Sequence, residues 1–348
     1  MSVRLTVDGV EVEVADGATI LDAAGEAGAS VPTLCDDDRL DPYGGCRLCL
    51  VAVDGAPRPV PACATPVTEG LAVDTAATAD LQRTLVEMLL ADHQDDNPGG
   101  RPNELTDLAA MLGVEPNVRL ASPRTPHTDD NPFLTVDPDA CILCARCVRY
   151  CREVMADAAL SLEGRGPSAR VAPTHGWSFL DTDCELCGGC ISTCPTGAIY
   201  ERSGERAGIR SDRDELASVR STCGFCGVGC QVDLKVRDDA IVKIDAAHDS
   251  PVNEGNLCVK GKFSYGFVDH PDRLGTPLVR EDGELREATW DEALDRTRDG
   301  LLGAVERHGA DAIGFLASAR CTNEENYLLQ KLARGVIGTN NVHSCAAT

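Results

Sequence analysis

Cysteines are the residues of this 348-residue chain that can do chemistry, and sixteen of the eighteen fall into four consecutive groups of four. The first group has the spacing C-x10-C-x2-C-x13-C and consists of Cys35, Cys46, Cys49 and Cys63. Thiolates are soft ligands that select zinc, copper(I) or iron–sulfur clusters over hard cations. A C-x2-C pair lets two sulfurs converge on one metal centre, so the other two ligands have to return from distant parts of the fold.

The residues before this group predict the scaffold that holds it. Apolar and polar residues alternate between positions 3 and 14 and are interrupted by Asp8-Gly9, which is typical of a β-hairpin turn. A helix from about Ile20 to Ala27 should pack on the hairpin. The pattern favours a small ferredoxin-like sheet whose loop wraps a 2Fe-2S cluster, with Gly44 and Gly45 allowing close approach of the backbone. A zinc knuckle is the alternative, although zinc sites favour two C-x2-C pairs and this group has one.

Two further groups share the spacing C-x2-C-x2-C-x3-C and consist of Cys141, Cys144, Cys147 and Cys151, then Cys184, Cys187, Cys190 and Cys194. This spacing is typical of bacterial two-cluster ferredoxins, in which the fourth cysteine of each run binds the other cluster. One 4Fe-4S cluster should therefore take the first three cysteines of the first run with Cys194, and the other the first three of the second run with Cys151. Disulfides are the alternative, but three cysteines within seven residues cannot pair locally without strain.

The fourth group has the spacing C-x2-C-x3-C-x27-C and consists of Cys223, Cys226, Cys230 and Cys258. This pattern resembles the N-terminal cluster domain of molybdopterin oxidoreductases. The formate dehydrogenase branch in particular is resembled by residues 257–261, 270–274, 288–294 and 319–331. In that family the lysine two residues after the fourth cysteine lies between the 4Fe-4S cluster and the pterin, so the resemblance implies this role for Lys260. A compact ammonium group suits the place between an anionic cluster and a polar pterin edge, and a solvated lysine is the alternative.

The resemblance covers nearly the whole chain, because the first 200 residues resemble the electron-transfer arm of NAD-linked formate dehydrogenases. This arm is shared with the large iron–sulfur subunit of respiratory NADH dehydrogenase. Relatives usually carry an H-x3-C-x2-C-x5-C cluster site after the 2Fe-2S domain, whereas here His93 is followed by Asn97, Gly100 and Thr106. None of these three can replace a thiolate. We therefore expect this cluster to be absent, residues 105–112 to remain a structural helix, and His93 to be a plain surface histidine.

The fold class that follows is a multi-domain α+β protein, because 348 residues exceed what one core usually holds. We expect a β-grasp 2Fe-2S ferredoxin domain at 1–78, a helical segment with the degenerate one-His, three-Cys site at 79–120, and a two-cluster 4Fe-4S ferredoxin domain at 132–205. The 4Fe-4S domain of molybdopterin oxidoreductases follows at 217–275, and the start of an α/β molybdopterin-binding domain at 276–348. Turn-rich stretches at 93–101, 122–138 and 203–214 mark the boundaries. Several of these units are too small to fold by apolar burial alone, so the clusters should act as staples.

The region after residue 277 predicts the opening of an α/β layer. Residues 290–307 should form an amphipathic helix, 312–316 a buried parallel strand and 323–335 another helix. One strand is too few for a parallel sheet, so the rest of the domain should lie on another chain or in a longer protein.

Two expectations concern the end of this region. In formate dehydrogenases the segment resembling residues 338–345 runs on to the cysteine or selenocysteine that ligates molybdenum, which would be position 349 here. A selenocysteine codon read as a stop is the hypothesis that follows. Cys321 and Cys345 belong to none of the four groups and should be small buried residues rather than ligands.

The charge balance restricts partners and location. A formal net charge of -24 and a pI near 4.6 argue against nucleic acid as a partner. Five lysines against 27 arginines, with many carboxylates, resemble a halophilic protein from a high-salt cytoplasm, where a Debye length of about 3 Å limits self-repulsion. An ordinary acidic surface is the alternative. No targeting segment or membrane-spanning run is recognisable, so we expect a cytoplasmic protein whose thiols remain available for iron.

These observations predict the iron–sulfur electron-transfer part of a formate dehydrogenase alpha subunit. In the complete enzyme, formate would be oxidised to CO2 at a molybdenum or tungsten bis-molybdopterin guanine dinucleotide centre. Electrons would pass through three 4Fe-4S clusters and one 2Fe-2S cluster to an NAD-reducing flavin/iron–sulfur partner or a soluble carrier. We assign no residue of this chain as catalytic. The alternatives are a non-catalytic subunit of an NADH dehydrogenase or hydrogenase, against which Lys260 argues, and a metal-stabilised fragment without activity.

Overall fold

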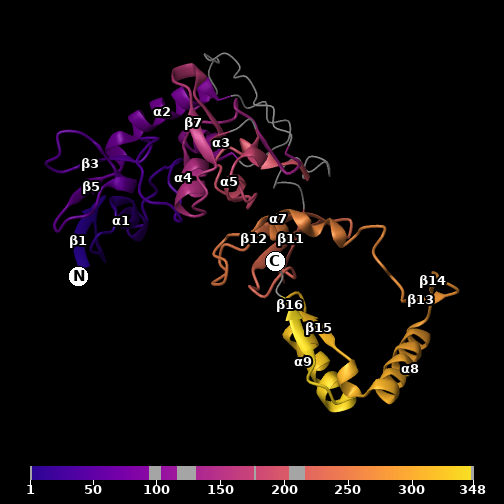
Figure 1. Ribbon diagram of the computed structural model, residues 1–348. Helices are drawn as coiled ribbons and strands as arrows, with labels where there is room; N and C mark the ends of the chain where they lie inside the picture. The colour runs from indigo at the N-terminus through magenta and orange to yellow at the C-terminus, as the bar shows by residue number, and fades with distance from the viewer. Residues whose placement is uncertain (1, 94–102, 116–130, 176–177, 204–215, 346–348) are drawn as a thin grey trace. The chain divides into compact units, whose positions relative to one another are not determined.

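The computed structural model describes residues 2–93, 103–115, 131–175, 178–203 and 216–345. Its chain divides into two compact units, Met1–Leu216 and Ala217–Thr348. Each unit combines short strands and helices (Figure 1), so the predicted fold class, a multi-domain α+β protein, is confirmed. Most of the three turn-rich stretches predicted as boundaries lies outside the described residues.

A five-stranded sheet forms the framework of the first domain. Its strands are β1 (Ser2–Val7), β2 (Val10–Ala15), β3 (Leu50–Val53), β4 (Val60–Pro61) and β5 (Ala72–Asp74). The order is β2-β1-β5-β3-β4, and β1 and β5 run parallel. Asp8 and Gly9 have φ values of 49° and 81°, as a type I′ turn requires, so the predicted hairpin is confirmed.

Helix α1 (Ile20–Glu26) lies across this sheet and begins at a capping box. The Thr19 hydroxyl accepts a hydrogen bond from the Asp22 N–H at 3.2 Å, and the Asp22 carboxylate accepts one from the Thr19 N–H at 2.7 Å. The buried face of α1 shares one apolar core with the sheet and with Cys49 and Cys63. The helix therefore fixes two cysteines of the first group.

A helical pair follows, made of α2 (Ala79–Asp92) and α3 (Glu104–Leu112), so the helix predicted at 105–112 is confirmed. Leu105 is fully buried and packs in one cluster with Leu34 and Leu48. These two leucines are sequence neighbours of cysteines in the first group. The pair thus supports the first cysteine loop, which comprises residues 34–49.

The prediction that His93 is a surface histidine is wrong, because its side chain is 6% exposed. Its Nε2 atom accepts a hydrogen bond from the Asn103 amide at 2.9 Å. The side-chain oxygen Oδ1 of Asn103 in turn accepts from two backbone N–H groups in the first turn of α3, at 3.1 and 3.3 Å, and so caps this helix. Asn97 and Gly100 of the degenerate site lie outside the described residues, whereas Thr106 lies within α3.

The two cysteine runs of the ferredoxin type lie in a domain of two antiparallel strand pairs and two short helices. Its elements are β6 (Leu134–Val136), α4 (Arg146–Glu153), β7 (Leu160–Glu163), β8 (Arg170–Pro173), α5 (Gly189–Ser192) and β9 (Ile199–Glu201). Strand β6 pairs with β9 and β7 with β8, both antiparallel. The first and last strands thereby close the domain, and α4 packs against α5.

The second unit begins with an antiparallel sheet and ends in α/β elements (Figure 1). The sheet is β10 (Ala217–Thr222), β11 (Gln231–Arg237) and β12 (Ala240–Ala246), followed by α7 (Val259–Phe263). The later elements are β13 (Leu278–Glu281), β14 (Glu284–Glu287), α8 (Trp290–His308), β15 (Phe315–Ser318), α9 (Asn323–Lys331) and β16 (Val342–Cys345). A π-helical segment, Leu332–Ile337, continues α9.

Three expectations for this region need correction. The strand predicted at 312–316 is β15, displaced toward the C-terminus because Ala310–Ala312 form a 3-10 turn, and its Leu316 is 81% exposed rather than buried. Strand β15 has a parallel partner, β16, and β13 and β14 form a hairpin, so this region has more than one strand. Cys321 is exposed and lies in the segment between β15 and α9. The side chain of Cys345 lies outside the described residues.

Helices α8 and α9 have no buried residues among those described. The large apolar side chains Trp290, Leu294 and Tyr327 are 69%, 59% and 65% exposed. Apolar helix faces of this kind are normally covered by other elements. Within the described ranges, no helix is both long enough and apolar enough to cross a lipid bilayer.

Candidate iron-sulfur sites

The first cysteine group converges on one place beneath the sheet. Cys35, Cys49 and Cys63 are at most 2% exposed, and Cys46 is half-buried. The sulfurs of Cys49 and Cys63 lie 3.3 Å apart, and the Cys46 N–H points at the Cys35 sulfur with an N···S distance of 3.3 Å. A hydrogen bond with the Cys35 thiol, together with burial, raises the pKa of Cys46 well above its ordinary value.

The two glycines predicted to admit a close approach have different roles. Gly44 has a φ of 65°, which favours glycine, and a Cβ placed there would lie 3.3 Å from the Ala64 Cβ. At Gly45 an added Cβ would lie 2.2 Å from the Tyr43 ring. The missing side chain of Gly45 therefore makes room for Tyr43.

Both ferredoxin-type runs fold in the same way around their first cysteine. Leu143 and Leu186 have φ values of 57° and 52°, which side chains rarely adopt. In this conformation each leucine N–H lies 3.4 Å from the sulfur two residues earlier, that of Cys141 or Cys184. Hydrogen bonds of this kind stabilise negative charge on a sulfur and offset the strain of the left-handed backbone.

The structure brings the cysteines of the two runs together in the crossed arrangement predicted from their spacing. Cys141, Cys144, Cys147 and Cys194 line one cavity, together with the apolar side chains of Val136, Ile142, Val171 and Ile199. Cys151 of the first run lies instead near Cys184, Cys187 and Cys190. At this short range a negative charge on Cys151 contributes to the raised pKa of each of these three thiols. Burial is the larger cause of this rise, and the pKa of Cys184 reaches about 11.

The chemistry of these donors fits iron–sulfur clusters. Burial raises the pKa of Cys147 and Cys190 far above that of an ordinary thiol, because desolvation disfavours the charged thiolate. Bound iron would supply the positive charge and release the thiol protons. Among the residues that the structure describes, no set of three or more His, Cys, Asp or Glu side chains is arranged to hold a single metal ion.

The fourth cysteine group surrounds the end of the three-stranded sheet. Cys223 follows β10 and Cys230 precedes β11, and the Cys223 N–H donates to the Cys230 carbonyl at 2.8 Å. Cys258 is the N-cap residue of α7, and Cys226 lies in the turn between β10 and β11. A Cβ added at Gly261 would lie 3.5 Å from the Cys223 sulfur. The first turn of α7 therefore runs close to this sulfur.

The two lysines of α7 differ in their surroundings. Lys262 is 5% exposed, and its ammonium group donates to the Ile244 carbonyl at 2.6 Å and lies 3.3 Å from the Asp245 carboxylate. Burial alone would raise the pKa of Asp245, but Lys262 and Lys243 lower it below its ordinary value. Lys262 thus fastens α7 to β12. Lys260, the residue singled out by sequence, is half-buried on the same short helix.

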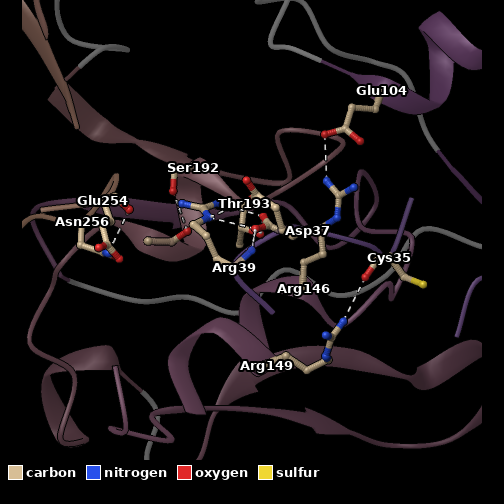
Figure 2. A network of polar contacts seen from close by, with 12 residues as sticks. Cys35, Asp37, Arg39, Glu104, Arg146, Arg149, Ser192, Thr193, Glu254 and Asn256 are labelled. Carbon is tan, nitrogen blue, oxygen red and sulfur yellow. Dashed lines mark hydrogen bonds and ion pairs between the residues drawn. The ribbon is translucent and has the colours of Figure 1, made fainter. Parts of the chain in front are cut away.

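Charged and polar side chains join the first cysteine loop to the ferredoxin-type domain (Figure 2). Asp37 accepts a hydrogen bond from the Thr193 hydroxyl at 2.6 Å and forms an ion pair with Arg39 at 2.8 Å. Burial opposes ionisation, but these partners hold the pKa of Asp37 well below its usual range. Arg146 of α4 forms an ion pair at 2.8 Å with Glu104 of α3. Arg146 and Arg149 stand inside the first ferredoxin-type run. These two arginines were a sequence signal for contacts with other segments, and our sequence analysis missed it.

Comparison with known protein families assigns each of these regions. Residues 1–78 match the 2Fe-2S iron-sulfur cluster binding domain, and residues 131–200 the ferredoxin-like domain of NADH-quinone oxidoreductase subunit 3. Residues 216–270 match the molybdopterin oxidoreductase Fe4S4 domain, and residues 273–348 the molybdopterin oxidoreductase domain. The fold and these matches define a protein with 2Fe-2S and 4Fe-4S cluster-binding domains. Residues 216–348 thus match molybdopterin oxidoreductase families, and they follow domains that match iron–sulfur cluster-binding families.

Individual relatives extend beyond this chain. The NADPH-Fe(3+) oxidoreductase subunit alpha of Geobacter sulfurreducens is 35% identical over 98% of this chain and 40% of its own length. A putative formate dehydrogenase of Staphylococcus aureus is 31% identical over 98% of this chain and 39% of its own length. The chain thus spans about two fifths of the curated relatives it matches. A solved NAD+-reducing NiFe-hydrogenase chain aligns with a TM-score of 0.51 and 32% identity, covering 58% of this chain and 88% of that one.

Proposed function

We propose that this chain is the iron–sulfur electron-transfer part of a formate dehydrogenase alpha subunit. The sixteen grouped cysteines would hold one 2Fe-2S and three 4Fe-4S clusters. The observation that carries the proposal is the convergence of these cysteines into separate sets, the last of which precedes a molybdopterin oxidoreductase domain. Bound clusters supply one-electron steps, and the complete protein would add a molybdenum or tungsten bis-pterin centre at which formate gives CO2, a proton and two electrons.

The residues of this chain have three tasks in such a function. The cysteine sulfurs would hold iron, and the burial of Cys147, which is 7% exposed, would limit the access of water to it. Backbone N–H groups next to Cys141 and Cys184 donate to the sulfurs and favour the more negative, reduced state. Lys260 would place a positive charge beside the fourth cysteine group, on the side of the pterin.

The first test is the metal content of the chain after anaerobic purification. We expect about 14 iron atoms and equal labile sulfide per chain, with no stoichiometric zinc, and one 2Fe-2S and three 4Fe-4S signals on stepwise reduction followed by electron paramagnetic resonance (EPR). One zinc ion in place of two irons would identify the first group as a zinc knuckle. Clusters that cannot be reduced reversibly would show that the chain is a metal-stabilised fragment.

The role of Lys260 can be tested separately. Replacing Lys260 with methionine removes a positive charge near the fourth group and should lower the reduction potential of that cluster, because the electron is then less stabilised. Lys235→Met removes a half-buried lysine of β11 and is the matched control. If both variants keep the parent potential, Lys260 is a solvated lysine.

The substrate of the complete protein separates formate dehydrogenase from its rivals. A relative named for NADPH and Fe(3+) is 35% identical, which favours NADPH-dependent iron reduction as the second candidate. Reduction of the clusters by formate, but not by NADPH, would support our proposal, and the opposite result would refute it. A complete protein without bound pterin would instead be a non-catalytic subunit of an NADH dehydrogenase or hydrogenase complex. The similarity to an NAD+-reducing hydrogenase chain supports a flavin-containing, NAD-linked partner, with a soluble carrier as the other acceptor.

A further inference from the structure

Arg149 is a buried cation in the middle of the first ferredoxin-type run. It lies on α4, two residues after Cys147 and two residues before Cys151. In the crossed arrangement these two cysteines belong to different 4Fe-4S sites. The Arg149 side chain is only 4% exposed, although an arginine rarely leaves water unless it is paired.

The partners of Arg149 lie on the first cysteine loop, between Cys35 and Tyr43. Its Nη1 atom donates to the Cys35 carbonyl at 3.0 Å, as Figure 2 shows, and its Nη2 atom donates to the Asp41 carbonyl. The guanidinium carbon lies 4.7 Å from the centroid of the Tyr43 ring. One planar fork therefore holds two backbone carbonyls and one aromatic ring of the same loop, a geometry that arginine can form and lysine cannot.

A second side chain of α4 reinforces this contact. Glu153 accepts a hydrogen bond from the Arg149 Nε atom at 3.3 Å and, through its other oxygen, from the Asp41 N–H at 3.0 Å. Both peptide groups that flank the Asp41 Cα are thus bound to α4. The loop is also held by the hydrogen bond between Asp37 and Thr193, which precedes Cys194.

We propose that Arg149 is a positioning residue that fixes the 2Fe-2S ligand loop against the helix carrying ligands of both ferredoxin-type clusters. The proposal rests on the function proposed above. A buried positive charge bound to the carbonyl of a ligand residue stabilises the added electron, since hydrogen bonds and net charge set the potential of a cluster. The same fork sets the orientation of the loop and hence the magnetic interaction between the 2Fe-2S site and its neighbours.

Two substitutions separate charge from geometry in the cluster-loaded chain. Arg149→Met removes both, and should lower the 2Fe-2S reduction equilibrium constant about tenfold, a downward shift of about 59 mV for a one-electron couple. It should also narrow the EPR line splitting between the 2Fe-2S site and the reduced 4Fe-4S clusters. Arg149→Lys keeps the charge but cannot reach both carbonyls, so it should retain most of the potential and still narrow the splitting.

The matched control is Arg152→Met on the same helix, because Arg152 is 67% exposed. This variant should change neither the 2Fe-2S reduction potential nor the EPR line splitting. The inference is overturned if Arg149→Met and Arg149→Lys hold all clusters with the potential and splitting of the parent chain, or if Arg152→Met produces equal shifts. If Arg149→Met fails to hold its clusters, the test rests on Arg149→Lys alone. An EPR line splitting equal to that of the parent chain would then overturn the inference. A parent chain without a 2Fe-2S signal would refute the proposed function itself, which keeps the two failures distinct.

Discussion

Replacement of Leu105 with alanine tests whether the helical pair supports the first cysteine loop. Leu105 is fully buried and shares its core with Leu34 and Leu48, which flank Cys35 and Cys49 in the sequence. Leucine-to-alanine changes at such positions destabilise proteins by about 2–5 kcal/mol. We take about 3 kcal/mol, because the surrounding leucines are fixed on separate elements and collapse into the cavity only in part.

Native-state hydrogen exchange measures this loss locally, which matters because a chain of several domains does not unfold in one step. At about 1.36 kcal/mol per factor of ten, 3 kcal/mol corresponds to about a hundredfold faster exchange. The acceleration should reach peptides covering both α3 and the loop containing Cys46 if the two share one core. Met111→Ala, on the same helix but 63% exposed, is the control and should stay within about threefold of the parent. Acceleration confined to α3, with the loop unchanged, would refute the supporting role.

Two other predictions concern the ferredoxin-type domain and the second unit. Replacing Cys144 and Cys194 together with serine should cost about four iron atoms, whereas replacing Cys144 and Cys151 should cost about eight; the reverse result would show that each run holds its own cluster. Lys262→Met removes an ammonium that lowers the pKa of Asp245. The stability that this ionised carboxylate contributes is present above its unfolded pKa and lost as the pH falls through its folded pKa, so the variant should acid-unfold at higher pH by circular dichroism. An unchanged acid transition would show that the ion pair of Lys262 and Asp245 contributes nothing to the stability of the domain.

Local patterns in the sequence predicted the parts of this structure that depend on neighbouring residues. The turn at Asp8 and Gly9 and helices α1, α3 and α8 follow from short-range periodicity and capping. The spacing of the cysteine runs also predicted that Cys194 lies with the first run. This long-range contact was predictable because the two-cluster ferredoxin pattern links the fourth cysteine of each run to the other run.

Contacts between segments distant in sequence were not predictable in the same way. Arg149 and Cys35 are 114 positions apart, and nothing in the spacing of either group links them. The burial of His93 depends on Asn103, whose capping role becomes visible only when α3 is in place. Leu316 was predicted as buried from its apolar neighbours, yet it is exposed, because side chains alternate along a strand and Ala317 is the buried residue of β15.

The degenerate site in the helical pair follows the same physical logic. Asn97, Gly100 and Thr106 offer no thiolate, so we expect α2 and α3 to depend on a source of stability other than a cluster. In the described part of the pair, this source of stability is an apolar core, because leucines of both helices pack with the first cysteine loop. The hydrogen bond between His93 and Asn103 joins the end of α2 to the start of α3. His93 is thus held by a structural contact, and the helical pair supports the neighbouring cysteine group.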